Sequence, residues 1–191
     1  MKKIILASAS PRRKELLEQI GLQFEVESSN CTEDMHSELA PHKLAESLSK
    51  EKAMAVAVHH RNAIILAADT FIVLGDKIMG KPHTPSHARQ MLAELNGKAH
   101  SVITGFTVLD TDENKTLSRS IETRVNIRKL TSEEIEAYVK SSEPLGKAGA
   151  YAIQGLGAVI IEGIEGDYSN VVGLPLNALV ESLKEFGINI L

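Results

Sequence analysis

Residues 99–130 read AHSVITGFTVLDTDENKTLSRSIETRVNIRKL, and this stretch decides the fold class. Ala99–Asp110 and Lys115–Leu130 are long segments rich in apolar and β-branched residues, and the polar turn Thr111–Asn114 separates them. This pattern is typical of two extended strands joined as a hairpin. Strands joined by a hairpin run antiparallel, so the sheet that contains them is mixed and not purely parallel.

Outside this hairpin, strands and helices alternate along the chain. Strands are expected over Lys3–Ala7, Phe24–Glu27 and Ala63–Ala68, followed by a small hairpin of Phe71–Leu74 and Lys77–Met79. Helices are expected over Pro11–Ile20, Pro41–His59, Thr84–Leu95, Thr131–Lys140 and Pro175–Phe186. The fold class is therefore α/β, or α+β on a strict count, with helices flanking a mixed twisted sheet. A length of 191 residues predicts a single domain over residues 1–191.

Composition excludes several classes of protein. The chain has 21 Lys plus Arg against 25 Asp plus Glu, a net charge of −4, and only seven aromatic residues, so a nucleic-acid surface is not expected. No apolar run approaches the roughly 18 residues of a membrane span, and the N-terminal apolar run is too short for a signal peptide. We therefore expect a cytoplasmic protein that does not bind membranes. Cys31 is the single cysteine, which rules out an intrachain disulfide.

The segment Ser8–Arg13 predicts an anion site. Ser8, Ser10, Arg12 and Arg13 surround the expected start of a helix, where unpaired N–H groups and the helix dipole favour a negative ligand such as phosphate. The alternative is a helix capped by Ser10 with solvated arginines, because Ser-Pro is a common helix start. Two cations at a helix N-terminus oppose the dipole, which favours an external anion.

Asp69 and Thr70 are expected at the end of an apolar strand, where ligands of open α/β sheets bind. The alternative for Asp69 is a turn residue that accepts local backbone hydrogen bonds. Lys52 falls on the apolar side of its predicted helix, so it either extends to solvent or reaches a buried anion. Lys81 follows in a Gly-Lys-Pro turn, and for both lysines a solvated side chain remains the alternative.

Carboxylates in the loop after residue 28 could hold a hard cation. Glu33 and Asp34 supply oxygen ligands of the kind that Mg²⁺ and Mn²⁺ prefer, and a solvated acidic loop is the alternative. His83 and His87 have a metal-ligand spacing without a third partner, so both are expected on the surface. The chain carries no complete dinucleotide-binding, P-loop or serine-hydrolase motif.

A set of short motifs together resembles the Maf family of nucleoside triphosphate pyrophosphatases, also called septum formation inhibitors. These motifs are LASASPRR at 6–13, ADT at 68–70, GKP at 80–82, HSVIT at 100–104, KAGAYAIQG at 147–155 and GLP at 173–175. Their order matches from residue 4 to about residue 186. The resemblance implies a fold related to the inosine triphosphate pyrophosphatases. It also implies hydrolysis of a nucleoside triphosphate to the monophosphate and pyrophosphate with Mg²⁺ or Mn²⁺.

The resemblance also implies a branch and residue roles. The KAGAYAIQG segment is similar to the dTTP and UTP branch, so the expected partner is a pyrimidine nucleoside triphosphate. Arg12, Thr70 and Gln154 fall on that branch's specificity positions. Asp69 matches the general base, and Glu33, Lys52 and Lys81 match other active-site residues, with Asp34 as the alternative to Glu33. The resemblance is also compatible with a homodimer.

Two other functions compete with catalysis. One is a cell-division regulator that acts through nucleotide or protein binding, a role attached to the family by its name. The other is a nucleotide- or nucleic-acid-binding module without turnover, which the arginines favour and the net charge of −4 opposes.

Overall fold

The structure is a computed structural model that describes residues 2–29, 31, 38–113 and 115–191. The strands are β1 (Lys3–Leu6), β2 (Glu25–Val26), β3 (Ala63–Leu74), β4 (Lys77–Met79), β5 (Ala99–Asp110), β6 (Thr116–Ile127) and β7 (Ile161–Glu165). The α-helices are α1 (Pro11–Gln19), α2 (Pro41–Ala57), α3 (Pro85–Leu95), α4 (Ser132–Lys140), α5 (Tyr168–Val172) and α6 (Leu176–Lys184). Two 3₁₀ helices, η1 (Ala148–Ala150) and η2 (Gly155–Ile160), lie between α4 and β7.

The sheet is mixed, as the sequence predicts. Six of its seven strands follow the order β2-β1-β3-β5-β6-β7, and the seventh, β4, pairs with β3 outside this path. β1 pairs in parallel with β2 and β3, whereas β3–β4 and β6–β7 are antiparallel. The predicted α/β class with a mixed sheet and flanking helices is therefore confirmed.

The chain forms two compact units. Unit 1 comprises Met1–Asp69, Thr104–Ile121 and Gly173–Leu191, and unit 2 comprises Thr70–Ile103 and Glu122–Val172. The chain crosses from one unit to the other within β3, β5 and β6, and again between Val172 and Gly173. The single domain over residues 1–191 stays a prediction.

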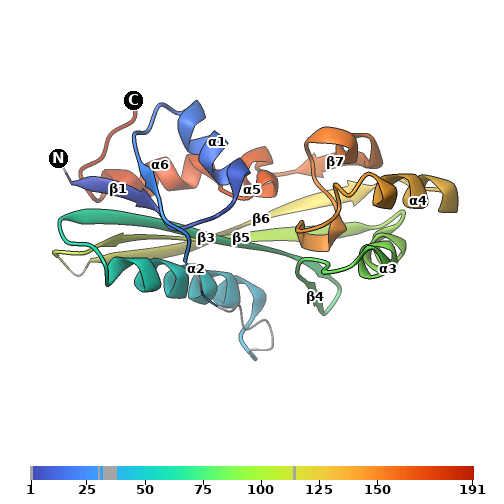
Figure 1. The fold of residues 1–191 in the computed structure, drawn as a ribbon, viewed down its shortest axis with the longest axis horizontal. Coiled ribbons are helices and arrows are strands. Elements are labelled where there is room, and N and C mark those ends of the chain that lie inside the picture. The colour runs from blue at the N-terminus through green and yellow to red at the C-terminus, as the bar shows by residue number, and fades with distance from the viewer. Residues whose placement is uncertain (1, 30, 32–37, 114) are drawn as a thin grey trace. The chain divides into compact units, whose positions relative to one another are not determined.

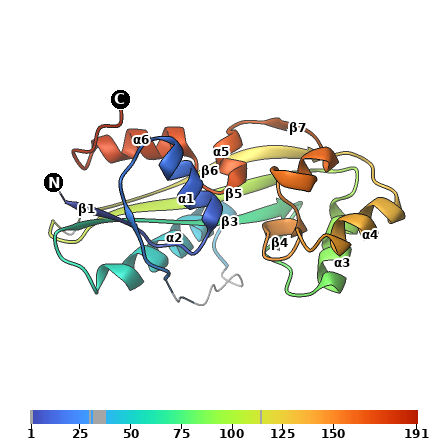
Figure 2. The ribbon, with the colours of Figure 1, turned by 45° about the horizontal axis from the view of Figure 1, so that its top comes forward.

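In unit 1, α2 covers one face of the sheet, and α1 and α6 cover the other (Figures 1 and 2). The seven buried residues of α2 recur with helical spacing and point at the sheet: Leu44, Ala45, Leu48, Ser49, Lys52, Ala53 and Val56. Gly105 of β5 allows the close approach, because a Cβ there would lie 2.1 Å from the carbonyl oxygen of Ala45. This contact fixes α2, and with it Lys52, against the sheet.

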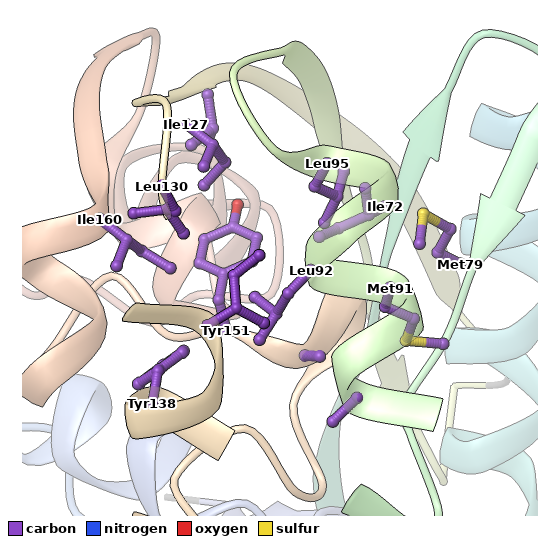
Figure 3. Packing of buried hydrophobic residues seen from close by; sticks show 14 of the residues in the cluster. Ile72, Met79, Met91, Leu92, Leu95, Ile127, Leu130, Tyr138, Tyr151 and Ile160 are labelled. Carbon is purple, nitrogen blue, oxygen red and sulfur yellow. The ribbon is translucent and has the colours of Figure 1, made fainter. Parts of the chain in front are cut away.

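Unit 2 is built around a separate apolar cluster. α3 packs against α4 and η1. Side chains from these elements and from the neighbouring strands surround the ring of Tyr151, as Figure 3 shows for Leu92, Leu95 and Leu130. Glycine suits position 149, since its φ is 64° and a Cβ would lie 2.1 Å from Cδ1 of Ile72. The glycine-rich segment after α4 is therefore an ordered part of the core.

Two local expectations are wrong. Asp69 does not end a strand, because β3 continues through it to Leu74. An ion pair with Lys52 balances its charge, so the carboxylate does not interrupt the buried strand. Ser10 occupies the N-cap position of α1, but its side chain makes no cap hydrogen bond. Instead, the hydroxyl oxygen of Ser8 accepts the N–H of Ser10, at 3.2 Å.

Candidate active site

In unit 1, the predicted residue Ser8 follows the end of β1, and the predicted residue Asp69 lies on the neighbouring parallel strand β3. β1 pairs with β3 in the register Leu6↔Leu66, and the N–H of Ala7 donates to the carbonyl of Leu66 at 2.7 Å. Ser8, just beyond the end of β1, is therefore level with the part of β3 that leads into Asp69. This edge, at the carboxyl end of a parallel strand, is where α/β sheets bind ligands.

Asp69 and Lys52 form a buried ion pair across the layer between β3 and α2. Asp69 is 2% exposed and Lys52 is 7% exposed. The Nζ of Lys52 donates to Oδ1 of Asp69. Of the two alternatives for Lys52, the structure therefore selects contact with a buried anion. A buried pair contributes little net stability compared with apolar residues of the same size. Stability alone therefore does not explain this pair, which points to a functional role for the two charges.

Arg13 is held in place by two motifs that are distant in sequence. Its Nε donates to the carbonyl of Gly173 at 2.8 Å, and its Nη1 donates to Oγ of Ser8 at 3.2 Å. Ser8 is buried, so one hydroxyl orients both the first turn of α1 and the Arg13 guanidinium. Arg12 is the adjacent half-buried residue of the same turn. The helix N-terminus and the two guanidiniums together favour an anionic ligand.

In unit 2, Lys81 and Gln154 lie in segments that a backbone hydrogen bond connects. The N–H of Gly149 donates to the carbonyl of Gly80 at 2.9 Å, which ties the start of the glycine-rich segment to the turn before Lys81. Lys81 is exposed, and Gln154 is half-buried just before η2. Thr70, also half-buried, follows Asp69 in β3.

The predicted metal ligands are only partly described. Glu33 and its alternative Asp34 both lie outside the described residues. Within the described ranges, no group of three or more His, Cys, Asp and Glu side chains is placed to hold a metal ion. His83 and His87 are exposed, as predicted. Every helix that the structure describes is too short or too polar to cross a lipid bilayer.

Sequence reasoning missed a group of polar residues in unit 2. Two side-chain hydrogen bonds lie around the segment that carries Gln154. One joins Tyr138 to Glu143, and the other joins His100 to Tyr151. His100 lies in the HSVIT motif and Tyr151 in the KAGAYAIQG motif, so the motifs mark both residues. Hydrophobic periodicity does not predict that the two side chains meet. Glu143 sits in a Ser-Glu-Pro turn whose pattern indicates only a loop.

Comparison with solved structures supports the fold. The chain is similar to the Ham1 protein of Staphylococcus aureus, with a TM-score of 0.55 and 12% identity, covering 97% of this chain and 100% of that chain. A HAM1 protein from Coxiella burnetii gives the same TM-score and coverage at 14% identity. At this identity the likeness concerns the fold alone.

Sequence relatives are much closer. A protein of Methanococcoides burtonii named dTTP/UTP pyrophosphatase is 49% identical over 191 residues, covering 100% of this chain and 98% of the relative. Proteins of the same name from Desulforamulus reducens and Moorella thermoacetica are 45% and 46% identical, covering all of this chain and 100% and 98% of their own lengths. Residues 3–186 also match the family model described as Maf-like protein. The chain therefore belongs to the Maf family.

Proposed function

We propose that this protein hydrolyses dTTP and UTP to the nucleoside monophosphate and pyrophosphate. The names of relatives that are 45–49% identical over the whole chain support this substrate choice. The structural observation that carries the proposal is the buried Lys52–Asp69 pair on β3, the strand that pairs with β1 just before Ser8. There a buried carboxylate is held in contact with the ammonium group of Lys52.

The charges of the site match a triphosphate. A nucleoside triphosphate carries about four negative charges, and phosphoryl transfer depends on neutralising and positioning them. Arg12 and Arg13 at the start of α1, with Lys52 in unit 1 and Lys81 in unit 2, are the cations assigned to this role. Arg13 needs little reorganisation because Ser8 and Gly173 already orient its guanidinium.

In the proposed reaction, a water oxygen bonds to the α-phosphorus. The bond between that phosphorus and the oxygen bridging to the β-phosphorus breaks, and pyrophosphate leaves. Asp69 accepts the proton that the water releases. Lys52 orients the Asp69 carboxylate by its contact with Oδ1.

A divalent cation is part of the proposal. Mg²⁺ and Mn²⁺ often use one or two protein carboxylates and take their other ligands from phosphate oxygens and water. The buried carboxylate of Asp69 is an oxygen donor of this kind, and Glu33 would be the second. When bound, such a cation neutralises negative charge on the leaving pyrophosphate.

Base recognition is assigned to Arg12, Thr70 and Gln154. The Gln154 side chain has both a donor and an acceptor, and uracil and thymine present both on the same edge. Purine bases present a different edge and a larger ring. Preference for pyrimidines is therefore expected to depend on Gln154.

The test is product analysis with a panel of ribo- and deoxyribonucleoside triphosphates in Mg²⁺ or Mn²⁺, with and without a chelator. We expect monophosphate and pyrophosphate from dTTP and UTP, and loss of turnover on chelation. Asp69→Asn should lower kcat by about 100-fold or more. The matched control is Asp76→Asn, an exposed aspartate of the β3–β4 turn, which should leave kcat unchanged.

Other outcomes would contradict specific parts of the proposal. Preference for purine nucleotides would contradict the role of Gln154. Unchanged turnover in Asp69→Asn would contradict the assignment of the base. Absence of turnover with every nucleotide would favour the regulatory alternative.

A further inference from the structure

The segment Ala152–Gly157, which carries Gln154, is held from both sides by one pair of side chains. Ahead of Gln154, the N–H of Ala152 donates to Oη of Tyr138 at 3.2 Å. Beyond it, the Glu143 carboxylate accepts the N–H of Leu156 on Oε2 at 2.9 Å and the N–H of Gly157 on Oε1 at 2.8 Å. The Tyr138 hydroxyl also donates to Oε1 of Glu143, at 2.9 Å, which closes the network.

The backbone fits closely around this pair. A Cβ on Gly155, where φ is 71°, would lie 2.6 Å from Oε2 of Glu143. A Cβ on Gly157 would lie 2.1 Å from the carbonyl oxygen of Ala152 and 2.6 Å from the Tyr138 hydroxyl. Glycine at both positions allows the main chain to wrap around the carboxylate and the hydroxyl.

The network is anchored in the core of unit 2 through Tyr138. Tyr138 is 6% exposed and packs in the apolar cluster of unit 2, with Tyr151 and Ile160 (Figure 3). Glu143 is half-buried, and its carboxylate accepts three donors. Hydrogen bonds to a charged acceptor are stronger than those between neutral groups. The position of the backbone at Gln154 therefore depends on the carboxylate of Glu143.

Precise placement matters for an amide that identifies a base. Rotation of the Gln side chain by 180° exchanges its donor and its acceptor, so the amide group alone suits cytosine as well as uracil. Discrimination between these bases requires that the surrounding chain hold the amide in one approach. Two backbone anchors after Gln154 and one before it fix the main chain from which this amide extends toward the base.

We propose that Glu143 is a positioning residue for base recognition, acting through the segment that carries Gln154. This inference rests on the proposed function, in which Gln154 contacts the pyrimidine. In Glu143→Gln, one carboxylate oxygen becomes an NH₂ donor. That donor then faces Leu156 N–H, or else Gly157 N–H and the Tyr138 hydroxyl. At least one anchor is lost, and the preference for uracil over cytosine falls.

The test measures kcat and KM for UTP and CTP in wild type, Glu143→Gln, Gln154→Ala and the double variant. We expect Glu143→Gln to lower the ratio of kcat/KM for UTP over CTP by about tenfold, the effect of one lost hydrogen bond, mainly through KM. In the Gln154→Ala background, the same change should alter the ratio by less than about twofold, because the positioned group is gone. Glu143→Asp keeps the carboxylate and should recover part of the ratio.

The matched control is Glu136→Gln, a carboxylate of α4 that accepts two hydrogen bonds from Arg89. It should leave the ratio at the wild-type value. A merely structural role of Glu143 would lower activity on UTP and CTP equally and add to the effect of Gln154→Ala, and either result would overturn the proposal. If Glu143→Gln does not fold, Glu143→Asp in the two backgrounds supplies the same comparison.

Failure of the proposed function can be distinguished from failure of the positioning role of Glu143. If wild type turns over no nucleotide, the proposed function is wrong, and the affinity ratio for UMP over CMP, measured by calorimetry, replaces the kinetic ratio. An unchanged affinity ratio in Glu143→Gln would then overturn the positioning role, and a loss that disappears in the Gln154→Ala background would support it.

Discussion

At the scale of single residues, Lys52 and Asp69 show why a buried charge is retained. Removing one partner leaves the other charge in a dry environment, whereas replacing both removes the cost of desolvation. We predict that Lys52→Met lowers the free energy of unfolding by about 3–5 kcal/mol. Lys52→Met with Asp69→Leu should be more stable than Lys52→Met alone. Urea unfolding at pH 7 measures both, and a double variant as unstable as the sum of the single variants would contradict the pairing.

His100 makes a second prediction at this scale, on the dependence of stability on pH. It is 4% exposed, and its Nε2 lies 2.7 Å from the Tyr151 hydroxyl oxygen. Among the residues that the structure describes, none forms a hydrogen bond with the buried Nδ1. Burial lowers the pKa of His100 from 6.5 to about 4. The folded protein therefore binds fewer protons than the unfolded chain between these two values, and acid favours unfolding.

From this pKa, we expect His100 to cost the folded protein up to about 3 kcal/mol as the pH falls from 6.5 to 4. His100→Gln removes the titrating group and should flatten that part of the curve of unfolding free energy against pH. His83→Gln replaces an exposed histidine and serves as the control. If the curves of wild type and His100→Gln run parallel from pH 6.5 to 4, His100 is not the group responsible.

At the scale of elements, the N-termini of α1 and α4 differ in whether the N-cap side chain stabilises the helix. Thr131 caps α4 through a capping box in which its side chain accepts the N–H of Glu134, and the Glu134 side chain accepts the N–H of Thr131. Ser10 begins α1 without a side-chain cap bond. We predict that Thr131→Ala lowers the free energy of unfolding by about 1 kcal/mol and leaves kcat/KM unchanged. Ser10→Ala should leave the free energy of unfolding unchanged and lower kcat/KM. Thermal unfolding and kinetics on UTP together can check both predictions.

How much the sequence predicts also depends on the element. Capping residues and periodicity predicted α3 and α4 to within a residue of each end, because Thr84 and Thr131 are strong local signals. β7 was missed. It has five residues with Gly163 in the middle and no buried position, so its pairing with β6 depends on distant residues.

In the candidate site too, features with a local signal were predictable and features that depend on distant residues were not. The helix start at Pro11 predicts an anion site at Ser8–Arg13, which stays a prediction. Helical spacing placed Lys52 on the buried face of α2, which is confirmed. The partner of Lys52 could not be predicted, since Asp69 lies 17 positions away on a strand whose length was underestimated. The Glu143 network depends on the main chain from 152 to 157, whose path follows from packing and not from local propensity.

At the scale of the whole molecule, the chain crosses between its two units inside three strands. β3 passes from unit 1 to unit 2 after Asp69, β5 passes from unit 2 to unit 1 after Ile103, and β6 passes back after Ile121. Loss of either unit disrupts strands on which the other depends. We therefore expect one cooperative transition, in keeping with a single domain.

Calorimetry measures this cooperativity directly. For 191 residues at about 0.7 kcal/mol per residue, one transition with an enthalpy of roughly 130 kcal/mol is expected near 60 °C. Leu48→Ala in unit 1 and Leu92→Ala in unit 2 are matched core deletions, at side chains that are 2% and 1% exposed. Each should cost about 2–5 kcal/mol and move the whole transition to lower temperature. Two separate transitions, with each deletion shifting only its own, would show that the units unfold independently and that the single-domain prediction is wrong.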